Sequence, residues 1–147
     1  MKFTVVTTIL ALSTAFALGT APRARADAKG CSDATLSGHH FAYTSLGSIV
    51  SAPEASIVGP YAEVGLQYFD GQGKVTFNYN ASQNGSVGAG TATGTYSVNA
   101  DCTGTFTETS DGFTTHFSFV ATGNGSDFQA ICQDPGVAVT RKGERQY

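Results

Sequence analysis

Closely spaced turn signals constrain the fold of this chain more than any other feature. Turn-forming pairs such as Asp70-Gly71, Asn84-Gly85 and Asp111-Gly112 recur about every 8–12 residues, the spacing typical of all-β domains. Threonine, glycine, valine and aromatic residues dominate between them, and no convincing amphipathic helix interrupts the pattern. The sequence therefore predicts strands near 38–46, 60–69, 74–81, 90–98, 103–110, 113–122, 127–133 and 137–142.

The hairpin around Asp111-Gly112 tests whether these strands have one apolar face. A two-residue turn there pairs Ser110 with Phe113 and, counting outward, Phe106 with Phe117. The phenylalanines then share one face, and the threonines share the other with His116. This separation is what a sheet with one buried face requires.

The hairpin around Asp70–Gly73 gives a similar separation if the turn holds four residues. Phe69 then pairs with Lys74, and Glu63 and Gln67 fall on the outer face. The opposite, apolar face gathers Val64, Leu66, Tyr68, Val75, Phe77 and Tyr79.

A sheet with a polar side and no covering helix must bury its apolar side against itself. A single antiparallel, up-and-down barrel of about eight strands does so and leaves no exposed edge, so we expect this all-β fold. A two-sheet β-sandwich is the alternative. A barrel of this size encloses a lumen that side chains fill or that holds one small ligand. The predicted lumen residues are Phe41, Tyr43, Tyr68, Phe77, Tyr79, Tyr96, Phe106, Phe117, Phe119 and Phe128.

The first 26 residues have the pattern of a secretory signal peptide. Lys2 precedes an apolar stretch that is short for a bilayer span, and Ala24-Arg25-Ala26 is a small-x-small cleavage site. We expect a mature chain that starts near Asp27, a barrel domain over residues 27–147, and a secreted or periplasmic location. No second apolar run predicts a membrane span.

Charge and cysteine content narrow the possible partners. Removal of residues 1–26 lowers Lys+Arg from 8 to 5 and leaves all 11 acidic residues, giving a net charge of −6. Such a chain is a poor ligand for nucleic acid. Outside the cytosol a disulfide is expected, and Cys31, Cys102 and Cys132 allow three pairings.

Several segments resemble a known family. They are Cys31–Gly38, Gly59-Pro60-Tyr61, Phe69–Gly73 and Gly94–Thr105, of which Val98-Asn99-Ala100-Asp101-Cys102-Thr103-Gly104-Thr105 is the most specific. The chain resembles small secreted, mainly bacterial proteins related to allene oxide cyclase-like barrels in the lipocalin-like (calycin) group. The resemblance implies a barrel and a Cys31–Cys102 disulfide, with Cys132 as an addition. No catalytic motif of the plant cyclases transfers to these residues.

Candidate chemistry rests on polar groups that face the lumen. Glu108 falls on the Phe106/Phe117 face, where aromatic surroundings would raise its pKa and suit a general acid or base; the alternative is a solvated residue at the barrel mouth. Tyrosine hydroxyls of the lumen are candidates for orienting a ligand, or are ordinary core groups. No cofactor motif occurs, and the histidines lack the acidic partners of a metal site.

Three functions fit these expectations. The first is a barrel that binds a small hydrophobic molecule through the aromatic residues of its lumen. The second is a cofactor-free cyclase or isomerase in which Glu108 handles the proton. The third is a structural envelope protein whose barrel is solidly filled.

Overall fold

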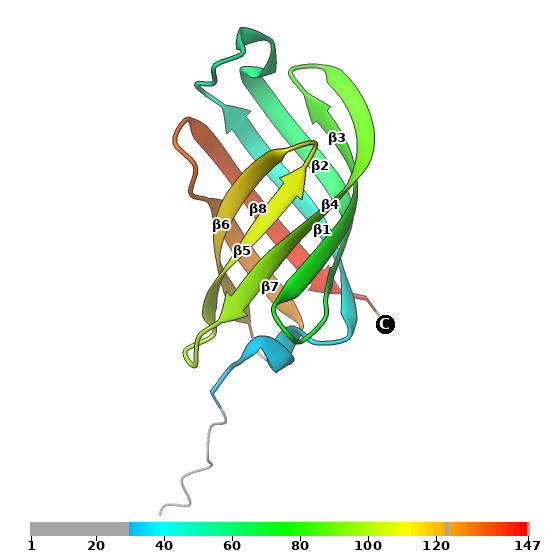
Figure 1. Cartoon of the computed structure of the whole chain (residues 1–147), viewed down its shortest axis with the longest axis vertical. Coiled ribbons are helices and arrows are strands. Elements are labelled where there is room, and N and C mark those ends of the chain that lie inside the picture. The colour runs from blue at the N-terminus through cyan, green and yellow to red at the C-terminus, as the bar shows by residue number, and fades with distance from the viewer. Residues whose placement is uncertain (1–29, 123, 147) are drawn as a thin grey trace, which may run out of the picture.

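The computed structural model describes residues 30–122 and 124–146, so the predicted signal peptide lies outside the described residues. Eight antiparallel strands form one closed barrel in which each strand pairs with its neighbours in sequence and the last closes on the first (Figure 1). This architecture confirms the up-and-down barrel over the sandwich. The strands are β1 His39–Ile49, β2 Gly59–Phe69, β3 Lys74–Gln83, β4 Ser86–Val98, β5 Thr103–Ser110, β6 Phe113–Thr122, β7 Asp127–Cys132 and β8 Val137–Arg145.

The β5–β6 hairpin has the register that the sequence predicts. Ser110 pairs with Phe113, and Phe106 pairs with Phe117. Phe106 and Phe117 are buried in the lumen, while the threonines of β5, Thr114 of β6 and His116 lie on the outer face. The Asp111-Gly112 turn sets this register because both residues have positive φ, of 50° and 83°, as a two-residue hairpin turn requires.

The predicted β2–β3 register is wrong by one residue. Phe69 pairs with Val75 rather than with Lys74. The Asp70 carboxylate accepts hydrogen bonds from the backbone N–H groups of Gln72 and Lys74, and Lys74 O accepts one from Asp70 N. These bonds draw Lys74 into the closing of the turn, which therefore holds one residue more than expected.

A shift of one residue moves every side chain of β2 to the opposite face. Tyr68, predicted in the lumen, lies on the outer face, where its ring is 5.0 Å from that of His40 between centroids. Val64 and Leu66 are likewise exposed. Glu63 and Gln67, predicted outside, are buried in the lumen instead.

The lower end of the barrel in Figure 1 is closed by a short 3-10 helix, η1 (Asp33–Leu36). Leu36 is fully buried against the barrel core, and the Tyr96 hydroxyl donates a hydrogen bond to Asp33 O. A disulfide joins Cys31, just before η1, to Cys102 in the β4–β5 turn, which confirms the pairing that the resemblance implies. The third cysteine, Cys132, is unpaired and buried.

Aromatic rings fill the lumen above η1. Phe41, Phe69, Phe106 and Phe119 surround Phe128 with centroid separations of 5.6–6.2 Å. These contacts are mostly edge-to-face or tilted, the arrangement that aromatic quadrupoles favour. The lower part of the lumen is therefore a packed core.

The upper end carries the β3–β4 hairpin, the β5–β6 tip and a second 3-10 helix, η2 (Ala55–Ile57). Three strands are several residues longer than the sequence predicts. β1 ends at Ile49, β4 begins at Ser86 and β8 ends at Arg145. The glycines and serines in these extensions weaken the strand signal in the sequence, but backbone pairing across the barrel includes them.

Candidate functional site

Four strands place a charged group inside the upper half of the lumen. Arg141 of β8 donates through Nη2 to Glu108 Oε2 of β5 at 2.7 Å and to Glu63 Oε1 of β2 at 3.0 Å. Its Nε donates to Ser45 Oγ of β1 at 2.7 Å. All four residues are buried. Ser45, Glu63, Glu108 and Arg141 are referred to below as the lumen charge cluster.

Two tyrosines complete the hydrogen bonding of Glu63. The hydroxyl of Tyr43 donates to Oε1 of Glu63, and the hydroxyl of Tyr61 donates to Oε2. Burial is the main reason why the pKa values of both hydroxyls lie well above their ordinary value, so both remain protonated donors. Glu63 thus accepts from two hydroxyls and one guanidinium.

Aromatic rings enclose the guanidinium of Arg141. Its Cζ lies 4.2 Å from the ring centroid of Tyr43 and 4.7 Å from that of Phe117. The rings of Phe77 and Phe106 follow at 5.5 and 5.6 Å. These cation–π contacts offset part of the desolvation cost of a buried cation.

The charges of the cluster do not balance when both carboxylates are ionised, because one guanidinium then faces two negative groups. Burial alone would lower the pKa of Arg141, but the carboxylates of Glu108 and Glu63 outweigh it and raise that pKa, so the guanidinium stays charged. Burial raises the pKa of Glu108 above its ordinary value, and Glu63 adds to the shift while Arg141 opposes it. Glu108 therefore takes up a proton at a higher pH than an ordinary glutamate.

Two buried side chains in the lumen have polar atoms without a hydrogen-bond partner among the described residues. One is Nη1 of Arg141, and the other is Gln67, whose two amide atoms are both unpartnered although the residue is 0% exposed. Unpartnered buried polar atoms are rare in folded proteins and call for a water molecule or a ligand. They mark the lumen around β2 and β8 as a place that can bind a polar group.

Half-buried tyrosines lie between the cluster and the upper end. Tyr79 shares a hydrogen bond of 2.8 Å with Ser110, and Tyr61 lies over Glu63. A Cβ at Gly90 would come within 2.6 Å of the Tyr79 hydroxyl, so glycine provides the space that this ring occupies.

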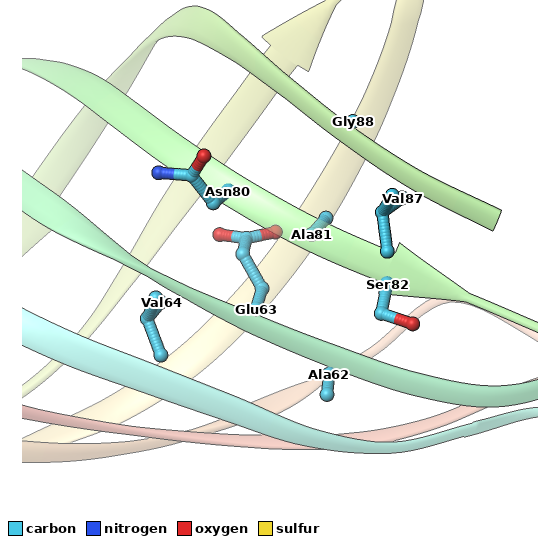
Figure 2. Close-up of a pocket in the computed structure, with 8 residues that line it drawn as sticks. All are labelled: Ala62, Glu63, Val64, Asn80, Ala81, Ser82, Val87 and Gly88. Atoms are coloured by element: carbon cyan, nitrogen blue, oxygen red, sulfur yellow. The ribbon is translucent and has the colours of Figure 1, made fainter. Parts of the chain in front are cut away.

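The structure has two hollows on its surface. The first, about 440 Å³, lies over β2, β3 and the start of β4, where Figure 2 shows its lining residues. By strand alternation most of these side chains point outward; Glu63 and Ala81, from the lumen face, also contribute. The second, about 380 Å³, lies at the other end of the molecule beside Ser126 and Arg145. Both hollows are open to solvent, and the first borders the lumen charge cluster through Glu63.

The structure brings together most of the predicted ligand-binding residues. The aromatic side chains buried in the lumen as predicted are Phe41, Tyr43, Phe77, Tyr96, Phe106, Phe117 and Phe119. Tyr79 is half-buried above them, and Tyr68 is on the outside. Glu108 is 8% exposed and paired with Arg141, rather than solvated at the mouth.

Sequence reasoning missed Arg141, Glu63, Ser45, Tyr61 and Gln67. The signal for Arg141 was present, because Val137, Val139 and Arg141 alternate along β8 and share one face. The signal for Glu63 and Gln67 was hidden by the incorrect register of β2.

No family model, curated protein or solved structure matches this chain. The resemblance to allene oxide cyclase-like barrels therefore stays a prediction. No helix in the described part of the chain has the length and apolar character that a membrane crossing requires. Within residues 30–122 and 124–146, no group of three or more metal-ligating side chains is arranged around a common point.

Proposed function

We propose that this protein is a secreted or periplasmic barrel that binds a small, mainly hydrophobic molecule in the upper part of its lumen. The observation that carries the proposal is the lumen charge cluster, a buried Arg141 with two carboxylates among aromatic rings. The aromatic residues would contact the apolar body of the guest, and the cluster would orient its polar group. The Cys31–Cys102 disulfide supports a location outside the reducing cytosol.

The free-energy cost of burying the charges of the cluster supports a functional role. Replacing a buried ion pair or triad by well-packed apolar residues is often neutral or stabilising, so such groups are weak contributors to stability. The barrel already has a large aromatic core to fold on. Perturbed ionisable groups gather at functional sites, and the raised pKa of Glu108 belongs to this pattern.

Isomerisation of the bound molecule is the second candidate, favoured by Glu108 itself. A carboxyl group with a raised pKa binds its proton more tightly than an ordinary glutamate, which suits a group that both takes up and returns a proton. Glu108 would take a proton from one carbon of the guest and return it to another, with Arg141 and Tyr43 donating to a developing negative charge. The guest keeps its composition, and no cofactor takes part.

A filled structural barrel is the third candidate, and the aromatic packing around Phe128 favours it.

Ligand capture separates this candidate from the other two. The oxidised protein, as secreted by its host, is purified without detergent, and small molecules released on denaturation are identified by mass spectrometry. Titration with the neutral dye Nile red measures binding directly.

We expect saturable Nile red binding that falls when Arg141 is replaced together with its partners, in the variant Glu63→Gln/Glu108→Leu/Arg141→Met. Lys142→Met is the matched control, because this neighbouring side chain is exposed on the outer face. Absence of any co-purifying molecule together with absence of dye binding would establish the filled barrel. Loss of turnover of a captured guest in Glu108→Gln, with affinity retained, would establish the isomerase.

A further inference from the structure

Among the described residues, the closed barrel retains an open strand edge at its upper end, along β4. β4 pairs with β3 from Ser86, opposite Gln83, to Thr95, opposite Lys74. Its pairing with β5 begins only at Thr93, opposite Thr109. The same register would place Thr91 opposite Asp111, which is already in the β5–β6 turn. Figure 1 shows the β3–β4 hairpin reaching beyond the β5–β6 tip.

The backbone groups that face this open side follow from the hydrogen bonds further down β4. Tyr96 N donates to Gly73 O on the β3 side, whereas Thr95 N donates to Thr107 Oγ1 on the β5 side. Because antiparallel strands alternate in this way, Val87 and Ala89 direct their N–H and C=O groups toward the open side. On this side the Ser110 hydroxyl donates a hydrogen bond to the carbonyl oxygen of Thr91, at 3.4 Å. Among the described residues, no strand pairs with Val87 or Ala89 there.

The features that usually protect a strand edge are missing from this segment. Residues 84–94 contain no charged residue and no proline, and the β3–β4 register continues without a bulge. Val87 and Phe113 are the most exposed large hydrophobic side chains of the described chain, at 83% and 76%. Both flank the open edge, since Phe113 pairs with Ser110 and Ser110 contacts Thr91.

We propose that the open edge of β4 is a homodimer interface, at which two copies of the chain pair antiparallel through residues 86–90. With Gly88 on the two-fold axis, Val87 of each copy faces Ala89 of its partner. Each of these two pairs exchanges two backbone hydrogen bonds, so the interface contains about four. A second copy fits because the segment is uncharged, so no like charges meet across the axis. The small side chains also let the two strands approach closely.

The pairing also covers the exposed hydrophobic side chains. Each Val87 packs beside Ala89 of the partner on the outer face, and Phe113 at the β5–β6 tip lies next to the new strand. The contact is small, so we expect a reversible dimer whose population rises with concentration between the micromolar and millimolar ranges.

The test combines sedimentation velocity with amide hydrogen exchange on the full mature, oxidised chain. We expect a monomer–dimer equilibrium in which the N–H groups of Val87 and Ala89 become protected as concentration rises. Val87→Lys should abolish the dimer at concentrations where the native chain is mostly dimeric. Ala89→Pro, which removes an edge donor but no β3 bond, should weaken association roughly ten-fold.

Val120→Lys is the matched control, because Val120 is a half-exposed valine on β6, which is paired on both sides. It adds the same charge and should leave the dimer intact. A monomer at every concentration would overturn the proposal. So would protection of Val87 and Ala89 that does not depend on concentration, because a segment of the same chain would then cover the edge. Equal effects of Val87→Lys and Val120→Lys would show that any dimer uses another surface.

Discussion

Removing all the charges of the lumen charge cluster should destabilise the protein less than removing the guanidinium of Arg141 alone. Arg141→Met removes the guanidinium and leaves Glu63 and Glu108 buried without their cation. Glu63→Gln/Glu108→Leu/Arg141→Met removes all the charge. Gln replaces Glu63 because the hydroxyls of Tyr43 and Tyr61 still need an acceptor there.

The expected magnitudes follow from the burial of the partners. Arg141 and Glu63 are 3% exposed and Glu108 is 8% exposed, so water screens little of the charge that Arg141→Met leaves behind. Breaking a buried pair from one side costs roughly 3–5 kcal/mol of unfolding free energy. The triple variant leaves no buried charge, and we expect its stability within about 1 kcal/mol of the native protein or above it.

Urea unfolding of the oxidised proteins at neutral pH measures both values. The deficit of Arg141→Met should shrink as pH falls, since protonation neutralises the stranded carboxylates. A triple variant as unstable as Arg141→Met, or one matching the sum of the single losses, would refute the reasoning. It would show that the cluster is a structural necessity, and the functional argument from its cost would fail with it.

Three further measurements test other parts of the structure. Because the pKa of Glu108 is raised in the folded state, this residue's contribution to stability is present at low pH and is lost as pH rises through that pKa. Across a pH series, the unfolding free energy of the native protein should therefore fall relative to that of Glu108→Gln as pH rises. Reduction of the Cys31–Cys102 disulfide, which spans 71 residues, should lower the unfolding free energy by about 4 kcal/mol in urea with reductant, and an unchanged midpoint would contradict the chain-entropy account. Phe128→Ala, in the centre of the ring cluster, should cost roughly 3–5 kcal/mol; a loss under about 1 kcal/mol would mean that the lumen is loosely packed.

Local turn chemistry decides how much of this fold the sequence reveals. The Asp111-Gly112 turn has a single register, so the faces of β5 and β6 and the inward position of Glu108 were predictable residue by residue. The turn after Phe69 offered two lengths, and the apolar count favoured the wrong one because Val64, Leu66 and Tyr68 are all hydrophobic. The hydrogen bonds accepted by the Asp70 carboxylate select the longer turn, and these are not visible in a hydrophobic pattern.

The candidate site was predictable in its aromatic part and in Glu108 for the same reason. An alternation rule assigns apolar residues to the lumen, so Phe77 and Phe106 were found while Glu63 and Gln67 were assigned to solvent. Arg141 shows a second limit: alternation with Val137 and Val139 places it on the inner face, but burial preference argues against an arginine there. Only the two carboxylates that meet it there, from β2 and β5, explain its position.

The two ends of the lumen have different chemistry, and this difference constrains how a guest would bind. The lower end is closed by Leu36 of η1 and tethered by the Cys31–Cys102 disulfide, whereas the upper end holds the charge cluster beneath Tyr61 and Tyr79. A barrel selected only for stability would continue its phenylalanine packing to the top, because buried ionic groups gain little over apolar ones. The polarity gradient instead fixes an orientation, with the apolar body toward the phenylalanines and the polar group toward Arg141. A guest that enters from the upper end has to pass these two tyrosines, so it should bind faster when Tyr79 is replaced by alanine; an unchanged association rate would exclude this route.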